Sequence, residues 1–231
     1  MIKIENTDVY GWEAATRGAR NPMNSWDKSD SYWTRICDPE TLETANFEYF
    51  VGDNDYRLLR NLANAGPDHG KYLRMVAVSV DITAPLYWWK EFDTYKVGTV
   101  ANSCSTMHKI HAKEFELDDF SREHLFDGID RIEGNSDSEY YENPTTCLDY
   151  VVHVLNYYRK KFIETGDKCY WWQLIQLLPS SYNQRRTVLL NYAVLRTQYH
   201  ARKHHKLDEW RFFCEWIESL PYSELITGVA A

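Results

Sequence analysis

Two polar side chains, Asn191 and Arg202, stand eleven positions apart in the C-terminal part of the sequence. The stretch 182–205 has the composition of one long helix, in which eleven residues make about three turns. Both side chains would then share one face, roughly 16 Å apart, with Leu195 and Gln198 between them. An amide and a guanidinium so placed suit a ligand with hydrogen-bonding rings at one end and a phosphate at the other. The alternative is a satisfied interior amide and a surface cation.

Cys104 lies in a run of small polar residues, 102–106. Lys96, His108 and Lys109 are close in sequence, and nearby cations favour the nucleophilic thiolate. Cys104 is therefore a candidate nucleophile. Free cysteines are more often buried and inert, and this alternative stays open.

The histidine pairs His200/His204 and His108/His111 have the spacing with which one helix face can hold a metal. No carboxylate partner accompanies either pair, so we expect basic helix ends and no metal site.

The formal net charge of −8 disfavours non-specific binding to duplex nucleic acid, where neutralisation of phosphates supplies most of the affinity. The segment 185–206 is nevertheless basic. It is either a solvated helix face whose cations suit the helix C-terminus or part of a phosphate-binding site.

Hydrophobic periodicity, capping residues and breakers predict the secondary structure. Helices are expected over 9–20, 53–65, 85–95, 146–163, 170–177, 182–205 and 208–220, and strands over 47–51 and 76–82. A majority of helix with a few strands indicates an α+β fold.

A chain of 231 residues has the length of one domain, 1–231, and its polar stretch 127–144 reads as a surface loop. No apolar run reaches the roughly 20 residues that span a bilayer, and the first residues have no signal-peptide pattern. The five cysteines are scattered and odd in number, which favours reduced thiols. We therefore expect a cytoplasmic protein that inserts in no membrane.

The stretch 84–102, A-P-L-Y-W-W-K-E-F-D-T-Y-K-V-G-T-V-A-N, resembles the centre of the flavin-dependent thymidylate synthases, the ThyX family. In that family an Ala-Pro pair leads through a helix into the signature R-H-R-x-x-S-x-N-x-x-S-x-R. Aligned without gaps, Lys96 takes the place of the second arginine, Thr99 that of the first serine and Cys104 that of the second serine.

Other landmarks agree with this alignment. His69 lies 15 residues before Ala84, the offset of a flavin-contacting histidine in the family. Leu178-Pro179, Asn191 and Arg202 match a downstream Leu-Pro, Asn and Arg at unchanged spacing. In the family that asparagine approaches the flavin and that arginine approaches the phosphate of dUMP.

The departures from the family pattern are large. Thr94, Ala101 and Thr106 stand where the signature has arginine, asparagine and arginine. Glu91 replaces a glutamine, and Ala193 replaces a further arginine. The fold should therefore transfer better than the activity.

The resemblance implies a mainly antiparallel, twisted sheet covered by helices. It implies a pyrimidine deoxynucleotide of the dUMP type as ligand and FAD as cofactor, with NADPH and methylenetetrahydrofolate as co-substrates if activity is retained. It assigns the flavin to His69, Lys96 and Asn191, the nucleotide to Arg202, Glu91 and Thr99, and the catalytic position to Cys104.

The resemblance also implies a homotetramer, and 9 Trp and 17 Tyr are more aromatic residues than one core of this size usually needs. The sequence thus leaves three functions open. One is a divergent enzyme that transfers one carbon to the nucleotide and reduces it. The second is a non-catalytic relative that binds a nucleotide or a partner. The third is an unrelated α+β protein or a metalloenzyme.

Overall fold

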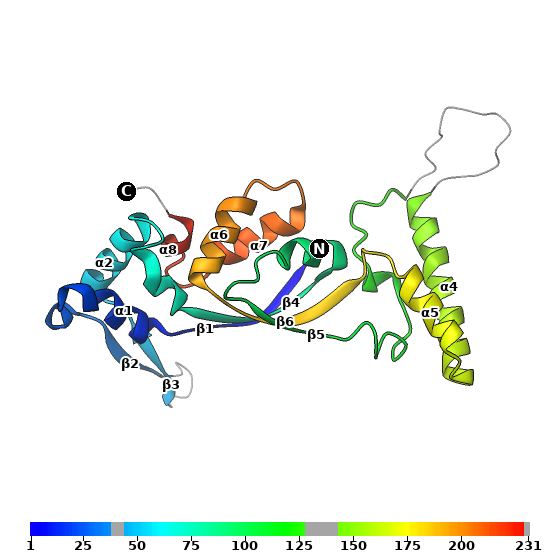
Figure 1. Cartoon of the computed structure of the whole chain (residues 1–231), viewed down its shortest axis with the longest axis horizontal. Helices are drawn as coiled ribbons and strands as arrows, with labels where there is room; N and C mark the ends of the chain where they lie inside the picture. The colour runs from blue at the N-terminus through cyan, green and yellow to red at the C-terminus, as the bar shows by residue number, and fades with distance from the viewer. Residues whose placement is uncertain (38–43, 128–142, 229–231) are drawn as a thin grey trace. The chain divides into compact units, whose positions relative to one another are not determined.

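The computed structural model describes residues 1–37, 44–127 and 143–228, so most of the loop expected at 127–144 lies outside the described residues. Its helices are α1 (Trp12–Arg20), α2 (Asp53–Asn64), α3 (Leu86–Phe92), α4 (Pro144–Thr165), α5 (Lys168–Leu177), α6 (Tyr192–Arg202), α7 (Asp208–Glu218) and α8 (Glu224–Thr227). Its strands are β1 (Lys3–Tyr10), β2 (Tyr32–Cys37), β3 (Thr44–Phe50), β4 (Ala77–Pro85), β5 (Val100–Ser103) and β6 (Asn183–Asn191). Single 3₁₀ turns are η1 (Asn21–Met23), η2 (Trp26–Lys28), η3 (Gly70–Arg74) and η4 (Leu117–Asp119) (Figure 1). No helix within these ranges is both long and apolar enough to cross a bilayer.

Four strands form one sheet in the order β1-β4-β6-β5, and β2 pairs with β3 in a separate antiparallel hairpin. The hairpin register runs from Tyr32 opposite Phe50 to Cys37 opposite Thr44, with an irregularity after Ile36. This combination of helices with antiparallel strands confirms the α+β fold class.

The prediction of one long helix over residues 182–205 is wrong in its first half. Residues Asn183–Asn191 form β6, and α6 begins only at the next residue. Along β6, Val188 and Leu190 are buried whereas Leu189 between them is exposed. This two-residue alternation is that of a strand with one buried face. The segment therefore folds as the strand that its alternation indicates, although its residues also form helices.

The chain divides into two compact units. Unit 1 comprises Met1–Lys3, Ile82–Thr94 and Asn102–Arg186, and unit 2 comprises Ile4–Asp81, Tyr95–Ala101 and Thr187–Ala231. Whether the chain is one domain in the functional sense stays a prediction.

Helices α4 and α5 lie side by side in unit 1 (Figure 1) and build its core. Leu148, Val152 and Leu155 recur on one face of α4 and are buried with Leu174 of α5. Asn143 begins α4 by accepting a hydrogen bond from the Thr146 amide, as the N-cap position favours.

A buried ion pair joins α1 to α2 in unit 2. Arg20 Nε lies 2.5 Å from Asp55 Oδ1, and both side chains are almost fully buried. The hydroxyls of Ser29 and Ser31 each donate to Asp55 Oδ2 at 2.6 Å. Burial alone would raise the pKa of Asp55. The hydrogen bonds from Ser29, Ser31 and Arg20 and the charge of Arg20 outweigh burial, so this pKa lies below its ordinary value.

Candidate functional site

Asn191 stands where β6 becomes α6, in unit 2. Its backbone is still extended, and its side-chain oxygen accepts a hydrogen bond from the Val194 amide at 3.1 Å. The residue is therefore the N-cap of α6, a position that favours asparagine. Because the oxygen is engaged in the cap, the amide nitrogen is the group of Asn191 that a ligand could meet.

The turn 96–99 lies against this end of α6. Gly98 has a φ of +80°, and a Cβ placed on it would come within 2.9 Å of Asn191 Nδ2 and 3.3 Å of Val194 Cγ2. Both the backbone conformation and the close approach require glycine here. The Oγ1 of the next residue, Thr99, is buried and has no hydrogen-bond partner among the described residues.

Arg202 ends α6 and is held by two aromatic side chains of unit 2. Its Nε donates to the Tyr95 hydroxyl at 2.9 Å. Its guanidinium carbon lies 4.7 Å from the ring centre of Trp210 and 5.6 Å from that of Tyr95. A cation over a ring face is attracted to it, so these contacts fix the plane of the guanidinium. A fixed, half-buried guanidinium is suited to binding a phosphate.

The helix face between these two ends is not open, which corrects the sequence expectation of a ligand-lining face. Leu195 and Gln198 are both fully buried. Neither amide atom of Gln198 has a hydrogen-bond partner within the described part of the chain. Asn191 and Arg202 therefore flank a buried stretch of α6 instead of lining one continuous groove.

The opposite face of α6 borders a cavity of about 620 Å³, within the range of small-molecule sites. The segment 63–74 forms the other wall, and Arg74, Arg196 and His200 are the basic side chains of the lining. Ala193, which the family resemblance aligns with an arginine, contributes a small side chain to it. Arg196 belongs to the basic segment 185–206, for which a phosphate-binding role was one of the two alternatives. Arg74 was not expected at a site, because only the fold brings segment 63–74 against α6.

The three basic side chains of this cavity differ in charge and in the contacts that hold them. Arg196 Nη1 donates to the Leu225 carbonyl at 2.7 Å, which anchors it at the end of α8. Burial, followed by the charges of Arg196 and Lys203, lowers the pKa of His200. His200 is thus a neutral hydrogen-bonding group at pH 7, and Arg74 is exposed. The described residues contain no cluster of three metal-binding side chains.

The other predicted side chains of unit 2 are near these features without lining the cavity. His69 is exposed and precedes η3, between the lining residues Pro67 and Gly70. Lys96 is exposed in the turn before Gly98, and its carbonyl accepts a hydrogen bond from the Thr99 amide at 3.4 Å.

Glu91 and Cys104 belong to unit 1. Glu91 is half-buried near the end of α3, and its carbonyl accepts hydrogen bonds from Thr94. Cys104 is exposed directly after β5. Its amide donates to the Arg185 carbonyl at 2.9 Å, and its carbonyl accepts from Gln184 Nε2 at 2.8 Å. The backbone of Cys104 is therefore fixed while its thiol remains accessible.

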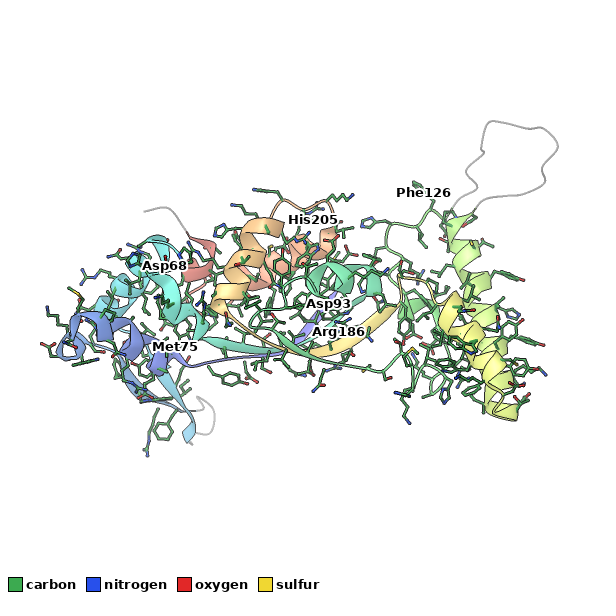
Figure 2. All side chains as sticks on the ribbon, in the orientation of Figure 1. Asp68, Met75, Asp93, Phe126, Arg186 and His205 are labelled. Carbon is green, nitrogen blue, oxygen red and sulfur yellow. The ribbon has the colours of Figure 1, made fainter. Side chains whose placement is uncertain are left out.

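Arg186 of β6 holds Gln184, the side chain that donates to the Cys104 carbonyl. The expectation of a solvated helix face at Arg186 is therefore wrong. Its Nε donates to Gln184 Oε1 at 3.0 Å, and its Nη1 pairs with Asp93 at 2.7 Å (Figure 2). Its guanidinium carbon lies 4.2 Å from the ring centre of Trp89. Arg186 is a structural residue that orients Gln184.

The basic segment 185–206 is thus not one surface. Its first arginines lie on β6 in unit 1, whereas Arg196 and Arg202 lie on α6 in unit 2. These two arginines occupy different places, one at the cavity and one against Trp210.

No protein-family model and no curated protein matches the sequence. Solved structures do match the fold. ThyX from Helicobacter pylori, complexed with FAD and dUMP, has a TM-score of 0.65 at 15% identity, over 99% of this chain and 100% of that chain. A UMP/dUMP methylase, PolB from Streptomyces cacaoi bound with 5-Br UMP, has a TM-score of 0.61 at 15% identity, over 99% and 94%. The chain therefore has the fold of the flavin-dependent thymidylate synthases.

Proposed function

We propose that the chain binds a pyrimidine nucleotide in unit 2 and that Arg202 binds its phosphate. The observation that carries this proposal is the fixed guanidinium of Arg202, held by Tyr95 and stacked on Trp210. Such a cation loses little freedom when a phosphate binds, so more of the interaction energy appears as affinity. The shared fold supports the choice of nucleotide, because the ThyX neighbour was solved with dUMP and the PolB neighbour with 5-Br UMP.

The cavity beside α6 fits a flavin in its size and donor chemistry. Arg74 and Arg196 suit a diphosphate, the neutral His200 suits a ring carbonyl, and His69 lies in the adjoining segment. The Asn191 amide lies outside this lining, and its assignment to the flavin rests on the family resemblance. When bound, FAD would supply the hydride for a reduction. Lys96 is exposed in the turn before Gly98, and the family resemblance assigns it to the neutralisation of phosphate charge.

The finer proposal is that the chain acts on a nucleotide of the dUMP type by one-carbon transfer and reduction. Methylenetetrahydrofolate and NADPH would be the co-substrates. For these steps the family resemblance assigns the catalytic role to the accessible Cys104 thiol and the base contacts to Glu91 and Thr99. Backbone hydrogen bonds hold the main chain of Cys104 in place, so the position from which its exposed side chain projects is fixed.

The second candidate is a nucleotide-binding protein without catalysis. Thr94, Ala101 and Thr106 favour it, because they replace signature groups that hold nucleotide and flavin in the related enzymes. The two candidates share the nucleotide site and differ in flavin binding and turnover.

Calorimetric titration of the parent protein with dUMP, dTMP and inorganic phosphate tests the nucleotide site. We expect both nucleotides to bind more tightly than phosphate alone. Equal affinity for all three would mean that the site recognises only an anion, and no binding of either nucleotide would contradict the proposal.

The absorbance spectrum of the purified protein, before and after FAD is added, separates the two candidates. A bound flavin band and complementation of a thymidine auxotroph support the enzyme. A colourless protein that binds dUMP but cannot be loaded with FAD supports the non-catalytic protein.

A further inference from the structure

The segment 95–99 follows the face of α6 that carries Asn191 and Arg202. At one end of the segment, the Tyr95 hydroxyl accepts a hydrogen bond from Arg202 Nε at 2.9 Å. At the other end Gly98 packs on Asn191, since a Cβ placed on Gly98 would lie 2.9 Å from Asn191 Nδ2. The segment therefore runs from the end of the helix back towards its start, and it covers the stretch of α6 between these two contacts.

This covered stretch holds a polar side chain that has no use in the fold as described. Gln198 lies between Asn191 and Arg202 in the sequence, at a spacing that puts all three on one face of α6. It has no exposed surface, and neither atom of its amide has a hydrogen-bond partner among the described residues. Thr99 Oγ1, at the end of the covering segment, is buried and unpaired in the same way. Such groups are unfavourable in a protein interior, so an amide that is retained there calls for a function.

The covering segment is lightly held. Lys96 and Val97 are exposed, Val97 to 92%. The turn is closed by a long hydrogen bond, from the Thr99 amide to the Lys96 carbonyl at 3.4 Å. Segments with few buried apolar contacts and exposed hydrogen bonds open at far lower cost than the whole fold. Movement of segment 95–99 would uncover Gln198 without unfolding α6.

We propose that segment 95–99 is a lid and that Gln198 binds the base of the pyrimidine nucleotide when this lid moves. The inference rests on the proposed binding of the phosphate by Arg202, which stays stacked on Trp210 of α7 as the lid moves. Gln198 precedes Arg202 by about one turn, or about 6 Å along the axis, so one nucleotide can reach both side chains. The amide matches the edge of uracil, because its oxygen can accept from the ring N–H and its nitrogen can donate to a ring carbonyl.

Gln198→Met tests the amide, because methionine keeps the unbranched shape and removes both polar atoms. The melting temperature without ligand should rise by about 2–4 °C, since two unpaired polar atoms leave the interior. Calorimetric titration should show that dUMP binds about tenfold more weakly. Binding of deoxyribose 5-phosphate, which lacks the base, should change by less than about twofold. The matched control Gln176→Met, at an exposed position of α5 in unit 1, should change neither melting nor binding.

Gly98→Ala tests the lid. A Cβ at this position would meet Asn191, and the φ of +80° disfavours alanine, so the substitution raises the free energy of the covering position. The uncovered fraction of the protein then increases, and association of dUMP in stopped flow should be at least about twofold faster than in the parent. Unchanged or slower association in a folded variant would mean that segment 95–99 is a fixed wall, which contradicts the lid.

Three results would overturn the role of Gln198. A lower melting temperature in Gln198→Met would mean that the amide stabilises the fold through a partner. Unchanged affinity for dUMP would mean that the amide does not contact the nucleotide. An equal loss for dUMP and deoxyribose 5-phosphate would mean that it does not contact the base.

Failure of the proposed function gives a different result. A parent protein that does not bind dUMP, or an Arg202→Ala variant that binds it as tightly as the parent, contradicts the nucleotide site and this inference with it. A folded Gln198→Met variant that binds dUMP like the parent, beside an Arg202→Ala variant that does not, contradicts this inference alone.

Discussion

Asp55 accepts hydrogen bonds from Arg20, Ser29 and Ser31 in the interior of unit 2. The three donors come from α1 and from the segment between η2 and β2, whereas Asp55 lies in the first turn of α2. One carboxylate therefore ties together three parts of the unit. Its removal would leave the buried Arg20 without its counter-charge.

We expect Asp55→Ala to lower the free energy of unfolding by about 3–5 kcal/mol, because removing one partner of a buried pair leaves the other charge uncompensated. Urea denaturation measures this change. Asp53→Ala, at an exposed position in the same turn, is the control and should change stability by less than about 1 kcal/mol. A similar loss in both variants would contradict the buried role of Asp55.

The lowered pKa of Asp55 also gives this stabilisation a pH dependence. A carboxyl with a lowered folded pKa stabilises the fold fully above its unfolded pKa, near 3.9, and the effect is lost as pH falls through the folded pKa. The stability difference between the parent and Asp55→Asn should therefore be constant between about pH 6 and 8 and shrink below about pH 4. A difference independent of pH down to about pH 2 would contradict it.

The junction of β6 and α6 is the element on which the candidate site depends. Asn191 both ends the strand and caps the helix, and the turn at Gly98 packs against it. Any shift of this junction would move the helix that carries Arg196 and Arg202.

Substitutions of Asn191 separate its capping role from its ligand role. Asn191→Ala should cost about 1 kcal/mol of unfolding free energy, whereas Asn191→Asp should retain most of it, because aspartate caps as well as asparagine. Asn191→Asp should nevertheless weaken binding of FAD, since it replaces an amide donor by a negative charge. Thermal denaturation and flavin titration measure the two effects. Unchanged flavin affinity in Asn191→Asp would limit Asn191 to capping.

Local signals explain which elements were predictable from the sequence. Helix α2 was found at 53–65 because it has acidic residues at its start and Gly66-Pro67 just beyond its end. Strand β4 was found from its alternation. Strand β6 was missed because its residues also form helices well, and the choice depended on sheet partners distant in sequence.

The candidate site was predictable only in part, for a related reason. Asn191 and Arg202 were identified by spacing and resemblance, and α6 does join them. Arg196 was identified only as one cation of the basic segment 185–206, and the aromatic partners of Arg202 and the side chain of Arg74 were not identified. Their positions depend on tertiary packing between segments far apart in the chain, which periodicity does not report.

At the scale of the whole molecule, exposed aromatic residues suggest that copies of the chain associate. Tyr150 and Tyr157 are 68% and 54% exposed on α4, and Trp172 is 42% exposed on α5. Aromatic side chains are enriched at protein interfaces. We expect a homotetramer by light scattering at micromolar concentration. A monomer at that concentration would contradict this expectation and any site completed by a second copy.

The central claim is that Arg202 binds the phosphate of a pyrimidine nucleotide, and calorimetric titration with dUMP tests it most directly. A charge-assisted contact contributes about 1.5–3 kcal/mol, so Arg202→Ala should weaken binding about ten- to a hundredfold. Arg202→Lys should recover only part of this loss, because an ammonium lacks the bidentate geometry. Lys206→Ala, which removes an exposed cation near the same helix end, is the matched control and should change binding by less than about twofold. Equal losses in Arg202→Ala and Lys206→Ala, with both proteins folded, would contradict the claim.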